Sequence, residues 1–526
     1  MNGTVKRKLV QSVGGRDYVV VSGHETATRT ALDVLRDQGN IVDAAIAGAA
    51  VLCGVLPHAC GVGGDCFILL HQDGKSHSLN GTGRSPGGLP ANVSAGQLAG
   101  GALSCSVPGM VGAWEALHRR FGSRPWRELF SPAISAARRG VEIADDFAKA
   151  LDSHRKQLDA DPGCRRLFLS PEARPASARV LIQPWLADTF DLLAREGARA
   201  LYRGELGQSL CKVVAELGGV LSQGDLAAYE PVWAVPAQFR YRGLDICVPP
   251  PNSYGLLMLL QLAALSSISL GRCDFDSAER LRLLMTAARQ AIAVGAPLLA
   301  DPRIVEAAYP QMPPPILVEQ LRAALTSPLD SGSGTDSLPP SHGTALISIA
   351  DKHGNGITII QSIFTPFGSH VGDASSGIVL NNRLLGFSTN PADLNFAGPG
   401  KRPAHTLSPA MALQDGRLRL LLTTPGGTGQ TITLVQILTG LVDYGLTLEQ
   451  ATRSARWSLD LQGNLLAEPG ISPSIIRQLN AVGLPVRAAG PEHRFFFGSA
   501  ECIHIGENME LTAVADNRRD AYAGGQ

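Results

Sequence analysis

Thr344 is the residue whose type and position point most directly to chemistry. It follows residues 326–343 (TSPLDSGSGTDSLPPSHG) and begins an apolar stretch, residues 344–350 (TALISIA). A threonine hydroxyl is a poor nucleophile unless a base lies beside it, and cutting the preceding peptide bond would supply one, the α-amine of Thr344 itself. We therefore interpret Thr344 as a candidate nucleophile freed by cleavage after Gly343. The alternative is a threonine that only begins a strand.

Ser362 is the second candidate, because a hairpin would return it to Thr344. A second apolar stretch, residues 356–362 (GITIIQS), follows the turn DKHGN at 351–355. The pattern predicts two antiparallel strands that are covered on both faces. Ser362 comes 362 − 344 = 18 positions after Thr344, so the pairing brings the two residues together. The alternative is that Ser362 is a solvated strand end.

A glycine-rich turn could hold a developing negative charge. The segment PGGTG at 425–429 follows a predicted strand, 418–423, and precedes a predicted helix, 431–442. The backbone N–H groups of Gly426 and Gly427 could converge on an oxyanion, since no Cβ blocks the approach. The alternative is a tight connection between strand and helix with no role in chemistry.

Motifs for metals and nucleotide cofactors are missing from the chain. It has no GxGxxG, no GxxxxGK[ST] and no HExxH, and its 12 histidines are scattered, without a pair at helical i, i+4 spacing beside a carboxylate. We therefore expect neither a metal site nor a cofactor.

The composition is that of a well-buried globular protein. Of the 526 residues, 44% are hydrophobic and 17% charged, and Lys+Arg and Asp+Glu number 46 each. A formal net charge of +0 produces no global field, so we expect no nucleic-acid or membrane partner. Small molecules are the expected partners.

The cysteines and the N-terminus bear on location. Nine cysteines, an odd number without a CxxC motif, are typical of reduced thiols in a cytoplasmic protein. No apolar run of a secretory signal follows the basic residues near the N-terminus, so we expect no such signal. The uncharged stretch 253–271 contains Gln261 and stands alone, and we interpret it as a buried helix instead of a membrane span.

Several elements must position these candidates. Apolar spacing predicts helices over 29–36 and 42–55 and a strand over 66–70. The Ser, Gly, Pro and Asp content of 326–343 is typical of a linker. The pattern as a whole predicts a layered α/β or α+β enzyme with one interruption.

Short motifs occur in a fixed order along the chain. They are QGNIVDAA at 38–45, PH at 57–58, GVGG at 61–64, SVPG at 106–109, GT at 343–344, DKHGN at 351–355, FGS at 367–369, LNNR at 380–383, KRP at 401–403, SP at 408–409 and PGG at 425–427. With these segments the chain resembles the γ-glutamyltransferase family of N-terminal-nucleophile hydrolases, over nearly its whole length.

The resemblance implies an α+β fold, a four-layer αββα sandwich made as one precursor. It implies self-cleavage into a large subunit, 1–343, and a small subunit, 344–526, that remain one intertwined domain, as a heterodimer or a dimer of heterodimers. In that scheme Thr344 attacks an amide carbonyl and its α-amine relays the proton. The N–H groups of Gly426 and Gly427 hold the oxyanion, and Ser362 hydrogen-bonds Thr344.

Departures from the transpeptidase pattern concern the substrate. The family's LNN segment usually continues into an acidic pair that grips an α-ammonium, whereas here Arg383 precedes Leu384, Leu385 and Gly386. The family's paired serines are replaced by His405 and Thr406, which we expect to bind the substrate. Without the acidic anchor, a buried substrate ammonium would cost several kcal/mol.

Two arginines remain as candidate partners for a substrate carboxylate. Arg84, in GTGRSP at 81–86, and Arg383 could each bind a carboxylate. The segments GTGRSP and AHTLSP are similar to those of the branch that contains oxamate amidohydrolases and related acylases. For Arg84 the alternative is a surface arginine that caps a glycine-rich loop.

Three hypotheses follow. The first is a cytoplasmic, self-processing amidohydrolase for small anionic amides, with oxamate as the model substrate. The second is a γ-glutamyltransferase or glutathione hydrolase with a rebuilt ammonium site. The third is an unprocessed, inactive member of the family with a binding role.

Overall fold

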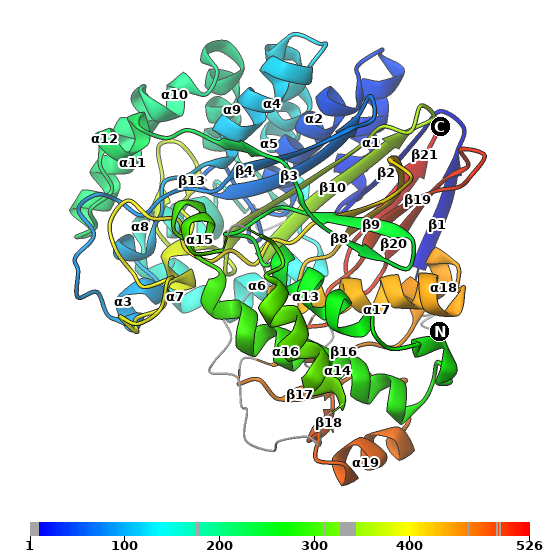
Figure 1. Ribbon diagram of the computed structural model, residues 1–526. Coiled ribbons are helices and arrows are strands. Elements are labelled where there is room, and N and C mark those ends of the chain that lie inside the picture. The colour runs from blue at the N-terminus through cyan, green and yellow to red at the C-terminus, as the bar shows by residue number, and fades with distance from the viewer. Residues whose placement is uncertain are drawn as a thin grey trace, which may run out of the picture.

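The protein folds around two seven-stranded sheets, which are packed face to face and covered by helices on both outer sides (Figure 1). The computed structural model describes residues 10–174, 179–309, 311–326, 343–460, 462–490, 493 and 496–526. All strand pairs within these two sheets are antiparallel. The arrangement is the four-layer αββα sandwich expected from the sequence.

The first sheet carries the hairpin predicted around Thr344. Its strands, in spatial order, are β21 (Tyr522–Gly525), β2 (Tyr18–Ser22), β10 (Gly343–Asp351), β11 (Gly356–Phe364), β3 (Asp65–Gln72), β4 (Lys75–Gly81) and β7 (Val232–Ala234). Every residue of β10 and β11 is buried. The expectation that these two strands are covered on both faces is confirmed.

The second sheet carries the strand that leads into the glycine-rich turn. Its strands, in spatial order, are β1 (Val10–Gly15), β20 (Leu511–Asp516), β19 (Glu501–Ile505), β15 (Arg417–Thr423), β14 (Ala410–Gln414), β9 (Leu244–Val248) and β8 (Ala237–Tyr241). Both sheets therefore combine strands from before and after Gly343.

Three apolar clusters hold the four layers together. One packs the first sheet against α1 (Glu25–Arg36), α2 (Ile41–Val55), α4 (Met110–Phe121), α5 (Ser131–Arg139) and α9 (Pro184–Glu196). Another packs the second sheet against α13 (Gly255–Leu265), α14 (Ala278–Gly295), α16 (Pro315–Thr326) and α17 (Gly429–Tyr444). The third lies between the sheets, where Val21 and Ala350 meet Met411 and Leu421. Figure 1 shows the two helical layers above and below the strands.

The other described helices and strands belong neither to the two large sheets nor to the helices named above. The helices are α3 (Ala95–Ala99), α6 (Asp145–Ser153), α7 (Arg155–Ala160), α8 (Pro162–Leu169), α10 (Arg199–Tyr202), α11 (Glu205–Glu216), α12 (Gln223–Ala227), α15 (Pro302–Ala308), α18 (Leu448–Arg453) and α19 (Pro473–Ala481). The strands are β5 (Val141–Glu142), β6 (Val180–Leu181), β12 (Gly372–Asp373), β13 (Ile378–Val379), β16 (Trp457–Leu459), β17 (Leu465–Ala467) and β18 (Val486–Ala488).

The helix predicted over 253–271 is buried but shorter than expected. It is α13, which ends at Leu265. The guanidinium of Arg242 donates hydrogen bonds to the carbonyls of Leu265, Ser266 and Ile268, so it satisfies groups that a helix end leaves unpaired. The prediction was wrong at its C-terminal end because this cap comes from another part of the chain.

The predicted linker falls mostly on residues 327–342, which lie outside the described residues. Thr326 ends α16 and Gly343 begins β10. Within the described ranges no single helix is both long and apolar enough to cross a bilayer, although Ala278–Leu298 and Pro302–Ala308, bent by 104°, meet the length and composition test as a pair.

Candidate active site

Thr344 and Ser362 lie together at one end of the β10–β11 hairpin. Gly343 pairs with Phe364 and Ala345 with Gln361, so two residues of β11 face Thr344 across a bulge. On the other side of β11, Ser362 pairs with Asp65 of β3. A bulge re-aims the side chains beside it. The end of three adjacent strands thus gathers Thr344, Ser362 and Asp65.

Ser362 contacts the peptide bond that precedes Thr344, and not the Thr344 hydroxyl. Its Oγ–H donates to the carbonyl oxygen of Gly343, and the Phe364 N–H donates to Ser362 Oγ at 2.7 Å. Phe364 has a φ of 85°, a strained value for a residue with a Cβ. The bulge offsets Ser362 toward Gly343, so in the uncut chain its hydroxyl polarises the carbonyl that self-cleavage would attack.

The glycine-rich turn adopts a backbone that only glycine tolerates well. Gly426 and Gly427 have φ values of 130° and 59°, and their carbonyls accept from the N–H groups of Gly429 and Gln430, both at 3.0 Å, as α17 begins. Among the described residues no hydrogen bond uses the N–H of Gly426 or Gly427 as donor. Pro425 lines a small cavity together with Thr344. The turn thus combines N–H donors that are unused within the described residues with a position next to Thr344.

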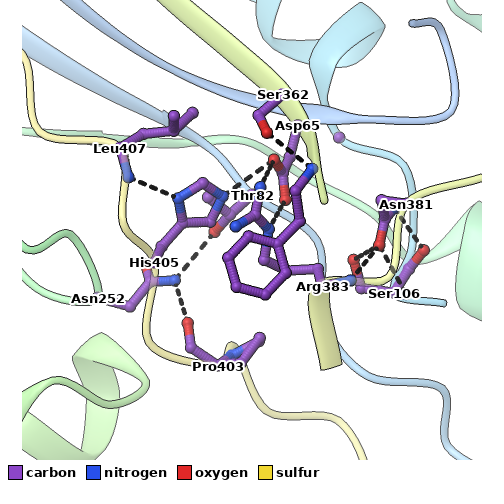
Figure 2. Close-up of polar contacts among 12 residues, drawn as sticks. Asp65, Thr82, Ser106, Asn252, Ser362, Asn381, Arg383, Pro403, His405 and Leu407 are labelled. Atoms are coloured by element: carbon purple, nitrogen blue, oxygen red, sulfur yellow. Dashed lines mark hydrogen bonds and ion pairs between the residues drawn. The ribbon is translucent and has the colours of Figure 1, made fainter. Parts of the chain in front are cut away.

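A buried ionic cluster, which we call the Asp65 cluster (Asp65, Arg383 and His405), adjoins this strand end (Figure 2). Arg383 Nε and Nη2 each donate to one oxygen of Asp65 at 2.9 Å. His405 Nε2 lies 2.9 Å from Asp65 Oδ1. All three side chains are 0% exposed. The Arg383 guanidinium also stacks 4.2 Å above the ring of Phe364.

The charge state of the cluster follows from its burial. Burial, and then the neighbouring Arg383, lower the pKa of His405 to about 4, so this imidazole is neutral near pH 7. Burial opposes ionisation of Asp65, but Arg383 and His405 more than offset it and hold the pKa of that carboxyl below its usual value. The Leu407 N–H donates to His405 Nδ1 at 3.3 Å, so the proton is assigned to Nε2. One cation and one anion remain.

This charge state predicts a stability loss in mild acid. The pKa of His405 is lower in the folded protein than in the unfolded chain. As pH falls from about 6.5 to about 4, His405 therefore binds a proton in the unfolded chain but not in the native protein. At pH 5 the free energy of unfolding should be lower by about 2 kcal/mol than at pH 7 through His405 alone.

Urea unfolding of wild type and His405→Gln at both pH values tests this. The variant should lose less stability, and His353→Gln, at an exposed histidine, should behave as wild type. Equal losses in wild type and His405→Gln would contradict the assignment.

Asparagine side chains fasten the loops around the Asp65 cluster. Asn381 Oδ1 accepts from the N–H and the hydroxyl of Ser106 and from the Arg383 N–H, and its amide donates to the Gly63 carbonyl at 2.9 Å. Asn252 donates to the Pro403 carbonyl at 2.6 Å and accepts at its own carbonyl from the His405 N–H at 2.8 Å. Five segments distant in the sequence, at residues 63, 106, 252, 381–383 and 403–405, are therefore tied to one site.

The structure does not bring Arg84 to the Asp65 cluster. Arg84 Nη1 lies 2.5 Å from Asp301 Oδ2 and 3.1 Å from the Gly400 carbonyl, and Arg303 shares the same aspartate. Among the described residues, no hydrogen bond or ion pair of Arg84 involves Thr344 or Arg383. Thr406, predicted beside His405, is buried, and its carbonyl accepts from the Ser408 hydroxyl at 3.0 Å. A role of either residue in substrate binding stays a prediction.

Sequence reasoning missed Asp65, which organises the cluster. A signal was present, because Asp65 is a charged residue between the glycine-rich loop 61–64 and a fully apolar stretch. A charge at the start of a buried strand needs a partner. The partner could not be identified from sequence, since Arg383 lies 318 positions away.

The described part of the chain contains no group of three or more His, Cys, Asp or Glu residues that could hold a metal ion.

Comparisons with known proteins agree on one family. The family model described as Gamma-glutamyltranspeptidase matches residues 27–525. The Glutathione hydrolase-like YwrD proenzyme of Bacillus subtilis (strain 168) is 31% identical over 98% of this chain and 99% of its own length. The Oxamate amidohydrolase proenzyme of Klebsiella pneumoniae is 29% identical over 96% and 98%. Among solved structures, cephalosporin acylase from Bacillus halodurans superposes with a TM-score of 0.88 at 26% identity, over 100% of this chain and 98% of that one.

Proposed function

Because this chain belongs to the gamma-glutamyltranspeptidase family, we propose that it cuts itself between Gly343 and Thr344 and then hydrolyses a small amide that carries a carboxylate, with oxamate as the model substrate. It is an amidohydrolase with the fold of N-terminal-nucleophile hydrolases. The cut position and the substrate are the proposed parts.

The hydrogen bond from Ser362 supports the cut position. It polarises the Gly343 carbonyl, which lies one bond from the Thr344 nitrogen at the start of a fully buried strand. After the cut the pieces 1–343 and 344–526 stay together as a heterodimer, because each sheet contains strands of both. Thr344 becomes the N-terminus of the smaller subunit and gains a free α-amine.

The reaction of the cut enzyme then follows ordinary acyl-transfer chemistry. Thr344 Oγ1 bonds to the amide carbon while the α-amine takes its proton. The oxyanion is held by the N–H groups of Gly426 and Gly427, which donate to no other group in the described part of the chain. The α-amine gives the proton to the leaving nitrogen as the C–N bond breaks. Water then hydrolyses the ester, which releases the acid and restores the hydroxyl.

One observation carries the proposal for an anionic substrate. Arg383 has a buried guanidinium nitrogen, Nη1, that finds no hydrogen-bond partner in the described ranges. The Arg383 side chain is paired with Asp65 and stacks on the ring of Phe364. Asp65 itself lies directly opposite Ser362 in the sheet. A buried cationic N–H without an acceptor is costly. A substrate carboxylate would satisfy it beside the reacting strand end.

The substrate class is tested by two assays on the same purified protein. Ammonia release from oxamate is compared with p-nitroaniline release from a γ-glutamyl anilide, both as kcat/KM. The proposal expects oxamate to be the better substrate. If the anilide turns over with the efficiency of a dedicated transpeptidase while oxamate does not, the protein is a γ-glutamyl enzyme instead. No turnover and no cut would favour a binding role.

Variants of the two arginines test which one binds the carboxylate. Arg383→Lys keeps the charge next to Asp65 but removes the forked donor, so KM for oxamate should rise by about 10- to 100-fold, the equivalent of one charge-assisted hydrogen bond. Arg84→Gln should raise KM less, because Arg84 already binds Asp301. The reverse order of effects would assign the carboxylate to Arg84.

A carboxylate placed at Leu385 should shift preference toward γ-glutamyl amides. The neighbouring Gly386 is unsuitable, since a Cβ there would lie 2.5 Å from the Ala404 carbonyl oxygen, whereas Leu385 is partly exposed. Leu385→Asp offers the substrate ammonium a counter-charge, so the anilide-to-oxamate ratio of kcat/KM should rise about two- to fivefold, the usual effect of one ion pair near a surface. Leu385→Asn, which adds no charge, is the control. An equal rise in both variants would show that size and not charge matters.

A cytoplasmic location is the last part of the proposal. All nine cysteines are free thiols in the structure, seven of them buried, as expected in a reducing compartment. Subcellular fractionation of the producing cells, with the free thiols counted in the purified protein, tests it.

A further inference from the structure

A small cavity beside Thr344 brings together side chains that the proposed turnover does not use. It has a volume of about 20 Å³, and Thr344, His58, Glu501, Asp146, Ser499 and Arg519 are among the residues that line it. A cavity of this size holds about one water molecule. The residues around it therefore line one small shared space.

Three buried polar atoms of these residues lack a hydrogen-bond partner within the described residues. They are Thr344 Oγ1, His58 Nδ1 and Glu501 Oε2, and their residues are 5%, 3% and 1% exposed. A buried polar atom without a partner is uncommon and calls for a reason. Three around one cavity, one of them the candidate nucleophile, point to a common role.

His58 is arranged as a proton acceptor. Its Nε2 lies 3.5 Å from Asp146 Oδ2, its ring stacks on Phe147 at 5.4 Å, and its carbonyl accepts from the Phe367 N–H at 3.0 Å. With the proton assigned to the nitrogen that faces Asp146, Nδ1 carries a free lone pair.

Glu501 is arranged as a proton donor. Burial raises the pKa of its carboxyl well above the ordinary value. The Ser499 hydroxyl donates to Oε1 at 2.9 Å, so Oε1 acts as the acceptor and the acidic proton belongs on Oε2. Thr423, which precedes the glycine-rich turn, pairs with Glu501 in the sheet and donates through Oγ1 to its carbonyl at 2.6 Å. The carboxyl is thus anchored on the strand next to that turn.

The first cut needs such a pair, because the base of the mature enzyme does not yet exist. Before cleavage the Thr344 nitrogen is an amide and cannot accept a proton. We propose that His58 and Glu501 are the acid–base pair of self-cleavage. This inference rests on the proposed cut at Gly343/Thr344.

This pair removes a proton from the Thr344 hydroxyl and supplies one to the Thr344 nitrogen. Thr344 Oγ1 bonds to the Gly343 carbonyl carbon while His58 Nδ1 takes the hydroxyl proton, and the Ser362 hydroxyl holds the resulting oxyanion. The C–N bond then breaks, and Glu501 Oε2 gives its proton to the Thr344 nitrogen, which leaves an ester and a free amine. His58 returns its proton to Glu501 across the cavity. Water hydrolyses the ester to the Gly343 carboxylate and the Thr344 hydroxyl.

The experiment follows cleavage of freshly translated full-length chain on denaturing gels. His58→Gln and Glu501→Gln should each slow the cut by about 100-fold or more, the ordinary worth of a general acid or base. The matched control is His154→Gln. His154 also packs on Phe367, but its Nδ1 faces the Ala150 carbonyl at 3.0 Å and it does not line the cavity. The control should cut within about twofold of wild type, an effect well below that of a lost acid or base.

Chemical rescue separates proton transfer from a structural role. Added imidazole should accelerate cleavage of His58→Gly by about tenfold or more, a part of what a positioned base contributes, and leave Glu501→Gln and His154→Gly unchanged. The thermal midpoint of each variant shows whether it folds. If His58→Gln does not fold, His58→Asn takes its place.

The outcomes distinguish this inference from the proposed function. An uncut wild-type chain would overturn both. A wild type that cuts at Gly343/Thr344, with folded His58 and Glu501 variants that cut equally fast, would overturn the acid–base pair alone. Slow cutting of His58→Gly that imidazole does not accelerate would also overturn it.

Discussion

Thr344→Ala should remain a single chain of 526 residues and lose amide turnover by about 10⁴-fold or more, as expected when a nucleophile is removed. The chain should still fold, because the lost hydroxyl has no hydrogen-bond partner within the described residues. Wild type should run as two pieces on a denaturing gel. Edman sequencing of the smaller piece should begin Thr-Ala-Leu-Ile-Ser.

Thr344→Ser is the matched control, since it keeps the hydroxyl and removes one methyl group. It should still cut and turn over, at a reduced rate. A Thr344→Ala chain that cuts itself, or a fully active uncut wild type, would remove Thr344 from the mechanism. The same gel measures self-cleavage, and the same oxamate assay measures amide turnover.

Ser362→Ala should slow self-cleavage by about 10²- to 10³-fold, the usual effect of losing one oxyanion donor. Its hydroxyl is the group that donates to the Gly343 carbonyl, and the negative charge develops on that oxygen during the cut. Gel time courses of freshly translated chain measure the rate. Since the variant also leaves the Phe364 N–H without its acceptor, its thermal midpoint is measured alongside.

Ser348→Ala provides the comparison for Ser362→Ala. Ser348 is equally buried on the same hairpin, but its hydroxyl lies 2.9 Å from that of Thr358, away from Gly343. The control should cut at nearly the wild-type rate. If both variants slow the cut alike, general loosening of the hairpin is the cause, and Ser362 has no special part.

The β10–β11 hairpin shows which features the local sequence pattern can predict and which it cannot. Two fully apolar stretches around a polar turn are enough to predict antiparallel strands and to place Ser362 near Thr344. The bulge at Thr344 cannot be predicted in this way, because it depends on how β10 and β11 fit their neighbours β2 and β3. That bulge decides that Ser362 contacts the Gly343 carbonyl and not the Thr344 hydroxyl.

Contacts between distant segments account for the other differences. Arg242 ends α13 earlier than its apolar composition predicts. Asp301 binds the guanidinium of Arg84, and the Ala404 carbonyl fills the space that a side chain at position 386 would need. Each partner lies far away in the sequence, and no periodicity or composition points to it.

The amino-acid sequence by itself determined the layered fold, the candidate nucleophile, the glycine-rich turn and the family, because these depend on local hydrophobic pattern, turn residues and motif order. Only the tertiary structure decided which charged groups meet. Asp65 with Arg383 and His405, and His58 and Glu501 around the Thr344 cavity, are set by packing between strands, helices and loops from the whole chain. Burial then sets their protonation, since the energy of a charge depends on the groups around it and not on its neighbours in sequence.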